Sequence, residues 1–461
     1  MPDSTQTNTT TTPDAGPAGQ LPTFEDLRAA TAASGPTDAQ LTAHFAPVFA
    51  AVAAGTAQRE LDHELAFAAI EYLRGAGFTR VRLGRQYGGI GASLPQLAEL
   101  LVDLAAADPN LPQALHGHFM FTEQHENESQ GAVSEWWLAE VAAGRIFGNA
   151  LVELPPSAGQ RPVHWIDADP DTVQAAAATG TTEVARLTGD KFYSTGAVFA
   201  DYLLVSAIKP GFEEDGPVFA IIDARDPGVQ RIDDWNGFGQ RLTASGTTTL
   251  DHVPVQAQRT QEFNVPTGVL AYTVLWLVLT ATQAGIGTTA LGEITAFVRG
   301  RRRTYDHAAA ETPAEDPLVH QVIGAVSAKV AAARQIVRGA AAVVEESYVQ
   351  VRGHIDLEDP VVVQAHTRAN ITLSEASLVV SELILDATNL IFETGGASAT
   401  DASRQLHQHW LNARTVASHT PLIYRTQAIG AYRLHGTVPP FHSTARNSAP
   451  AATPSATTPG A

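Results

Sequence analysis

Residues 184–207 read VARLTGDKFYSTGAVFADYLLVSA, and this stretch decides the fold that the rest of the chain surrounds. Its β-forming runs are short and are separated by glycine and aspartate; they are Val184–Leu187, Lys191–Ser194 and Tyr202–Ala207. Such spacing is typical of an antiparallel sheet. Because similar runs continue on both sides, the sequence predicts one antiparallel β-barrel or β-sandwich domain over residues 145–262.

Helical periodicity flanks this β region on both sides, over residues 23–144 and residues 263–440. The helices predicted before it are Asp26–Ala33, Asp38–Ala53, Ala57–Gly75, Leu94–Ala107, Leu111–Glu126 and Ala132–Ala143. The longer ones predicted after it are Val269–Arg303, Asp316–Val351, Asp359–Glu393 and Asp401–Ser418. We therefore expect an α+β fold: an N-terminal helical domain, a middle β domain and a C-terminal four-helix bundle, which commonly supplies an oligomer interface.

The composition narrows the classes of partner. A formal net charge of −19 disfavours nucleic acid and anionic membranes, and the absence of cysteine excludes disulfides and Cys-ligated metals. Residues 1–22 and 441–461 have the composition of disordered tails, and the first lacks the features of a signal peptide, so we expect a cytoplasmic protein. The uncharged run Asn264–Gly292 could be a membrane span, but its polar content favours a buried central helix.

Basic and acidic residues are distributed unevenly along the chain. No Asp or Glu follows Asp401, whereas the same stretch contains several arginines and histidines. Such a region would stabilise an anion or a reduced cofactor. His407 and His409 lie on different sides of a helix, so no metal site is predicted.

Several separated motifs resemble the acyl-CoA dehydrogenase fold. Leu187–Gly196 is similar to the strand pair that lies against the flavin in that superfamily, and residues 235–254 are similar to its next conserved run. Further motifs resemble one branch, the flavin-dependent monooxygenases typified by dibenzothiophene and dimethyl-sulfone-type enzymes: KFYSTG (191–196), GQRLTASGT (239–247), GNA (148–150), GGASA (395–399) and WLNARTVASHTP (410–421). One departure is Val152, where this branch often has serine.

The resemblance implies a two-component monooxygenase. Such an enzyme takes reduced FMN, or FAD, from a separate NAD(P)H-dependent flavin reductase and forms a C4a-hydroperoxide with O2. It would oxygenate a small, largely apolar substrate, most plausibly at sulfur; an N- or C-hydroxylase of an amine, indole or phenol is the alternative. An acyl-CoA dehydrogenase is disfavoured because its usual catalytic carboxylate would fall in Ala417–Pro421, which contains no acid. The resemblance also implies a homotetramer or homodimer.

The resemblance also assigns site residues. His419 is the leading catalytic candidate and His118 the second, since an imidazole can donate to a peroxide oxygen; the alternative for each is a core or interface histidine. Asn149, Ser194 and Thr195 would contact the flavin ring, although ordinary hydrogen bonding at strand ends explains them equally well. The predicted phosphate site comprises Arg301 or Arg303 with the turn Gly395, Gly396, Ala397 and Ser398; its alternatives are a solvated basic face and a helix cap. His116, His407 and His409 are predicted at helix surfaces or interfaces.

Overall fold

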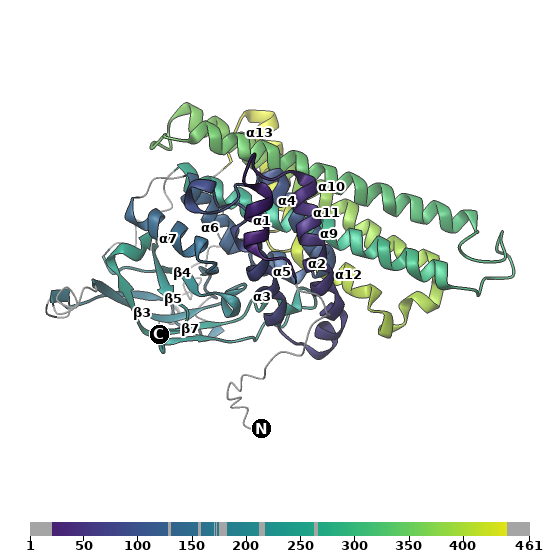
Figure 1. Ribbon diagram of the computed structural model, residues 1–461, viewed down its shortest axis with the longest axis horizontal. Helices are drawn as coiled ribbons and strands as arrows, with labels where there is room; N and C mark the ends of the chain where they lie inside the picture. The colour runs from purple at the N-terminus through teal and green to yellow at the C-terminus, as the bar shows by residue number, and fades with distance from the viewer. Residues whose placement is uncertain are drawn as a thin grey trace, which may run out of the picture.

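The computed structural model describes residues 21–127, 131–154, 158–169, 171, 173–174, 182–211, 217–261 and 266–439. The predicted tails, residues 1–22 and 441–461, therefore lie outside the described residues, except for Leu21 and Pro22. Figure 1 shows the β strands at one end of the molecule, the N-terminal helices beside them, and the long C-terminal helices extending away from the sheets.

The N-terminal part of the chain is helical, as predicted. Its helices are α1 (Phe24–Thr31), α2 (Asp38–Asp62), α3 (Phe67–Ala76), α4 (Leu94–Ala107), α5 (Asn110–Ala114), α6 (His116–Asn127) and α7 (Ala132–Ala142). The side chain of Ser93 accepts from the Gln96 amide in a capping box, and this cap begins α4 at the predicted residue. The predicted break near residues 53–57 was wrong, because α2 continues through Gly55 and ends at His63 in a left-handed conformation.

The middle part forms two four-stranded sheets. One has the order β1 (Phe147–Ala150), β4 (Tyr202–Ala207), β5 (Val218–Asp223), β8 (Thr260–Gln261), and the other has the order β2 (His164–Asp167), β3 (Glu183–Lys191), β7 (Thr248–Gln256), β6 (Val229–Arg231). The prediction of purely antiparallel pairing was wrong at one place, since β1 pairs with β4 in parallel. The strand predicted over Val184–Leu187 is longer than expected, since β3 continues past Gly189 to Lys191. The strand predicted over Lys191–Ser194 was wrong, because beyond Lys191 only an isolated bridge forms, between Phe192 and Val152.

The C-terminal part is a helical bundle, as predicted. Its helices are α9 (Pro266–Gly300), α10 (Pro317–Val351), α11 (Pro360–Leu390), α12 (Leu406–Ala417) and α13 (Leu422–His435), the last of which was not predicted. Helix α9 packs against α4, α6, α10, α11 and α12, so it is surrounded by other helices. By length and composition Gly268–Gly300 could cross a membrane, but 89% of its most apolar window is buried inside the protein, as for a core helix.

One hydrophobic core runs through all three parts. Trp137 of α7 stacks on Phe147 of β1 with ring centroids 3.6 Å apart, which fixes the first strand against the helical layer. Because β1 carries Asn149 two residues later, this packing also positions a predicted site residue. The domain boundaries at residues 144/145 and 262/263 remain a prediction.

Candidate active site

Three segments distant in sequence meet beside the junction of α5 and α6. A Cβ atom on Gly117 of α6 would lie 3.1 Å from Asn149 Oδ1, so the glycine permits the close approach of β1. A Cβ atom on Gly196, which has φ of +74°, would lie only 1.9 Å from the carbonyl oxygen of Ala114. The loop after β3 therefore contacts α5 through a position that only glycine can fill. These contacts bring Asn149 and Ser194 to the same helix junction.

Asn149 and Ser194 each bury a polar atom that lacks a partner. Asn149 is 7% exposed and Ser194 is 1% exposed. Neither Asn149 Oδ1 nor Ser194 Oγ has a hydrogen-bond partner among the described residues. A buried polar group without a partner costs about 1–3 kcal/mol, so such groups are expected where a ligand completes the hydrogen bonds. Both atoms therefore fit the edge of a polar, planar cofactor such as a flavin.

The hydroxyl of Thr195 is already used within the protein. Its Oγ1 lies 2.8 Å from Ser245 Oγ, and Ser245 Oγ lies 2.8 Å from Thr243 Oγ1. This chain of hydroxyls holds the segment after β3 against the GQRLTASGT motif. Thr195 thus shapes the site but has less capacity to bind a ligand than Ser194.

The GQRLTASGT loop also contacts the helical bundle. The backbone amide of Gln240 donates to Asn412 Oδ1 of α12 at 2.7 Å, and both residues are buried. A Cβ atom on Gly239 would lie 2.2 Å from the carbonyl oxygen of Leu411, so the loop and α12 are in close backbone contact. Since His419 follows the end of α12, this contact relates the position of His419 to the GQRLTASGT loop of the β region.

His419 pairs with His116, not with His118. The rings of His116 and His419 are edge to face with centroids 6.0 Å apart. The prediction that His116 is a surface or interface residue was wrong, because it is 2% exposed at the start of α6. Its Nδ1 lies at hydrogen-bond distance from the carbonyl oxygen of Gln113 and therefore donates to it, which leaves Nε2 with a lone pair.

Both histidines of this pair are neutral at physiological pH. Burial lowers the pKa of His116. Desolvation by the surrounding protein, followed by the nearby His116 and Arg425, lowers the pKa of His419. The side chain is exposed at the rim of the cavity in this single chain. The lowered pKa favours an uncharged imidazole with one donor and one acceptor nitrogen.

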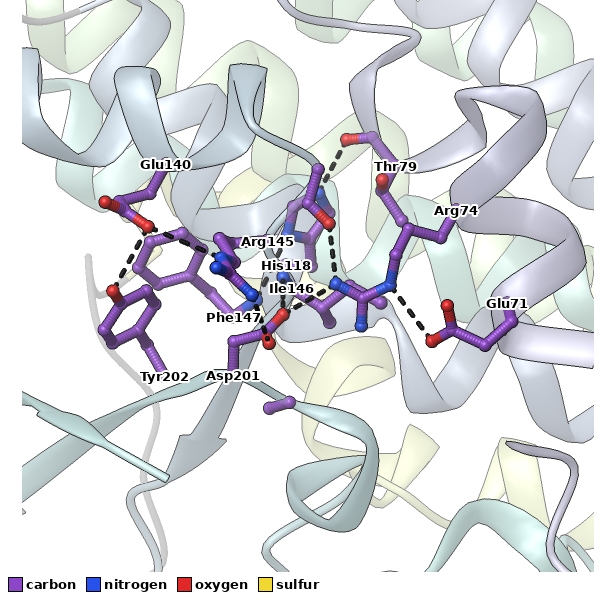
Figure 2. A network of polar contacts seen from close by, with 12 residues as sticks. Glu71, Arg74, Thr79, His118, Glu140, Arg145, Ile146, Phe147, Asp201 and Tyr202 are labelled. Atoms are coloured by element: carbon purple, nitrogen blue, oxygen red, sulfur yellow. Dashed lines mark hydrogen bonds and ion pairs between the residues drawn. The ribbon is translucent and has the colours of Figure 1, made fainter. Parts of the chain in front are cut away.

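His118 belongs to a structural network (Figure 2). Its Nε2 donates to the carbonyl oxygen of Thr79 at 2.7 Å, and its Nδ1 accepts from the amide of Phe147 at 3.3 Å. Nearby, Asp201 accepts from Arg74 at 2.8 Å, and the network joins the helical layer to the sheets. Burial lowers the pKa of His118 to about 4. With both ring nitrogens engaged, His118 has no free donor for a substrate.

A narrow cavity lies behind His419, between α9, α11 and the C-terminal segment. Its walls are Trp276, Leu279, Thr280, Gln283, Ser377, Ser381, Val416, Ala417, His419, Thr420, Leu422 and Arg425. In the part of the chain that the structure describes, none of these lining residues is Asp or Glu. The cavity therefore offers aromatic, hydroxyl, amide and guanidinium groups but no carboxylate base.

The predicted phosphate residues lie elsewhere. The Arg301 guanidinium donates to the carbonyl oxygen of Gly395 at 2.8 Å, and Arg303 is exposed. Gly396, Ala397 and Ser398 belong to a short 3-10 helix, not a simple glycine turn. At a helical rise of about 1.5 Å per residue, Arg301 lies about 27 Å along the α9 axis from Gln283. The structure thus separates this cluster from His419 within one chain.

The arrangement of a helical domain, two small sheets and a long helical bundle is the acyl-CoA dehydrogenase fold. Residues 277–423 match the family model described as acyl-CoA dehydrogenase, C-terminal domain. The FMN-bound structure of TdsC from Paenibacillus sp. A11-2 superposes with a TM-score of 0.73 at 23% identity, covering 86% of this chain and 98% of that one. Methanesulfinate monooxygenase MsuC from Pseudomonas fluorescens superposes with a TM-score of 0.72 at 24% identity, covering 88% and 98%.

The sequence relatives of this chain include flavin-dependent monooxygenases. A dibenzothiophene monooxygenase from Mycolicibacterium goodii is 27% identical over 393 residues, which cover 80% of this chain and 87% of the relative. A probable FMNH2-dependent monooxygenase, SfnC, from Pseudomonas putida is 25% identical over 380 residues, covering 80% and 89%. These proteins confirm the resemblance to flavin-dependent monooxygenases predicted from the motifs. They are oxidoreductases, and FMN is the flavin that the names of the relative SfnC and the TdsC structure contain.

Sequence reasoning missed two residues of this site. His116 stands two positions before His118, and only the orientation of α6 decides which imidazole faces His419. Arg425 lies in the stretch after Asp401, which contains no Asp or Glu. The sequence therefore did indicate an arginine without a carboxylate nearby in the chain. Arg425 is buried because α13 packs against α11.

Proposed function

We propose that this protein is a two-component flavin-dependent monooxygenase. It would receive reduced FMN from a separate NAD(P)H-dependent flavin reductase and use O2 to oxygenate a small molecule, most plausibly at sulfur. A relative and a structural neighbour that are named for sulfur compounds, dibenzothiophene and methanesulfinate, support this substrate atom. The observation that carries the proposal is a pair of neutral histidines, His116 and His419, at the same helix junction as the unpartnered Asn149 Oδ1 and Ser194 Oγ.

Each of these residues has a role that its chemistry allows. Bound reduced FMN would supply the reactivity toward O2. Asn149 and Ser194 would hydrogen-bond the flavin ring and fix its orientation. His419, uncharged, would donate one proton-bearing ring nitrogen toward the oxygen atoms, whereas His116 Nε2 would accept a hydrogen bond there. The surrounding apolar residues would exclude water and so limit the loss of oxidising equivalents as hydrogen peroxide.

The flavin phosphate would be bound between subunits. The predicted phosphate residues are Arg301, Arg303 and the segment Gly395–Ser398. They lie near the end of α9 that is remote from Gln283 and His419, so we propose that they bind the phosphate of the flavin held by a neighbouring copy. Helix α13 exposes Ile423, Tyr424 and Leu434 at 64–78% of their surface, which supports a homodimer or homotetramer. A cytoplasmic location remains a prediction.

Two other functions remain as alternatives. An N- or C-hydroxylase of an amine, indole or phenol would use the same site, and the substrate contacts alone would differ. An acyl-CoA dehydrogenase would require a carboxylate beside the substrate, and the described cavity residues supply none. The histidine pair and the missing carboxylate together favour oxygenation.

The coupling of O2 consumption to product formation tests this assignment. His419→Ala and His116→Ala should each release about tenfold more hydrogen peroxide per reduced FMN consumed, because each variant lacks one neutral imidazole that can hydrogen-bond the oxygen atoms. His164→Ala is a matched control, because His164 is exposed on β2 and is not among the residues assigned to the site. Unchanged peroxide release in both site variants, or bleaching of bound oxidised flavin by an acyl-CoA, would contradict the proposal.

A further inference from the structure

Arg425 is a buried cation without an acidic partner. It is 7% exposed and lines the cavity beside His419. Its guanidinium lies over the Trp276 ring, 3.8 Å from the centroid, and Nη1 donates weakly to Ser377 Oγ at 3.4 Å. No ion pair joins it to a carboxylate among the described residues. By contrast, the buried Arg82 pairs with Glu123 and Glu345.

Burying a charge without a counter-ion is unfavourable. Buried charges in natural proteins are almost always paired and hydrogen-bonded, and an unpaired one is retained mainly where it has a function. Consistent with this cost, desolvation lowers the pKa of Arg425 to about 9. A stacked position over Trp276 holds the guanidinium plane in one orientation and compensates only part of this cost.

Other polar atoms of the same cavity also lack partners. Arg425 Nε, Gln283 Oε1 and Ser381 Oγ have none within the described parts of the chain, and Gln283 and Ser381 are 4% and 1% exposed. Since an amide can present its NH2 group in place of its oxygen, the three side chains can act together as donors. An arginine fork with two further donor side chains lining the same cavity is an arrangement that can bind a two-oxygen anion.

We propose that this cavity, about 20 Å³ in volume, opens by side-chain movement to bind the anionic group of the substrate, a small organic oxoanion such as a carboxylate or sulfinate. Arg425 would hold two of its oxygens, Ser381 and Gln283 would donate to the remaining lone pairs, and the apolar body of the substrate would extend toward His419. This assignment rests on the proposed monooxygenase function, and it refines the substrate from a largely apolar molecule to an amphipathic anion.

A flavin phosphate could supply the same anion chemistry. The position of Arg425 in one cavity with His419, where the reacting atoms are expected, favours the substrate. The two sources differ in a measurable way, because FMN carries a phosphate and riboflavin does not. A phosphate at Arg425 would make the affinity for FMN, but not that for riboflavin, depend on this side chain.

Direct binding measurements test the inference without turnover. Calorimetric titration of the purified full-length protein with benzenesulfinate should give at least about tenfold tighter binding than with the neutral methyl phenyl sulfoxide. Arg425→Gln should weaken benzenesulfinate binding by about 10- to 100-fold and leave the sulfoxide unaffected. Arg425→Lys should recover part of the affinity, because it restores the charge without the fork.

Arg433→Gln is the matched control. Arg433 lies on the same helix but is exposed and paired with Glu375, so its loss should leave benzenesulfinate binding unchanged. Melting temperatures of all variants verify that they are folded. The inference is rejected if the wild type does not discriminate between the two probes, or if folded Arg425→Gln binds benzenesulfinate normally. It is also rejected if Arg425→Gln weakens FMN binding by that factor and spares riboflavin.

The proposed function can fail separately from this inference. If benzenesulfinate binding depends on Arg425 but the protein gives no oxygenation with reduced FMN and O2, the monooxygenase assignment is wrong and the anion site stands. If oxygenation occurs without Arg425-dependent anion binding, only the substrate class is wrong.

Discussion

The acid sensitivity of the fold should depend on His118. The ring is 0% exposed, and its Nδ1 must stay unprotonated to accept from the Phe147 amide. Burial lowers the folded-state pKa of His118 from the ordinary 6.5 to about 4, so below pH 6.5 the unfolded chain binds a proton that the folded chain does not. Stability is therefore lost as the pH falls through this window. Between pH 7.5 and pH 4.5 the contribution of this one group amounts to about 2.5 kcal/mol.

Replacing His118 by glutamine removes this titration. We expect His118→Gln to be less stable than the wild type at pH 7.5, because its hydrogen bonds to Thr79 and Phe147 are weakened or lost. This difference should shrink by about 2.5 kcal/mol at pH 4.5, where the wild type carries the protonation penalty. Urea unfolding at both pH values measures the difference, and His307→Gln is the exposed control. A wild-type-minus-variant difference that is the same at both pH values would refute the reasoning.

Three further substitutions have expected outcomes. Gly196→Ala should destabilise the fold by at least about 2 kcal/mol and weaken FMN binding, since its Cβ would lie 1.9 Å from the Ala114 carbonyl oxygen; thermal unfolding and FMN titration measure this. Lys191→Met should cost about 3 kcal/mol by leaving Glu153 without its 2.5 Å partner, and adding Glu153→Gln should recover most of it in urea unfolding. Asn412→Ala should cost about 1–3 kcal/mol by leaving a buried loop amide unpaired, whereas a neutral result in thermal unfolding would show that the loop does not depend on α12.

Much of the fold could be predicted from local sequence signals. Helix α4 begins and ends at the predicted residues because Ser93 caps it and proline follows at its start. The long bundle helices were predicted to within a few residues at most of their ends, since their apolar periodicity is sustained. The break predicted within α2 failed because a single glycine costs only about 1 kcal/mol in a helix, which packing easily exceeds. The parallel pairing of β1 with β4 depends on long-range packing and leaves no local signal.

The candidate site was less accessible to sequence reasoning. Asn149, Ser194 and His419 follow from motifs, and the structure positions the first two with unpartnered polar atoms. The choice between His116 and His118 could not be made from sequence. Both stand on one short helix, and only its rotation decides which ring faces His419 and which joins the structural network. Arg425 was missed for a related reason: its burial arises from helices far apart in the chain.

The central claim is that this chain binds reduced FMN and directs its reaction with O2 into a substrate. The most direct test mixes the purified protein with reduced FMN under argon, admits O2, and follows absorbance in a stopped-flow instrument. We predict a transient absorbance, distinct from oxidised FMN, that outlasts the reaction of free reduced FMN and decays more rapidly in His419→Ala. Oxidation at the rate of free reduced FMN, with no transient and full release of hydrogen peroxide, would contradict the account.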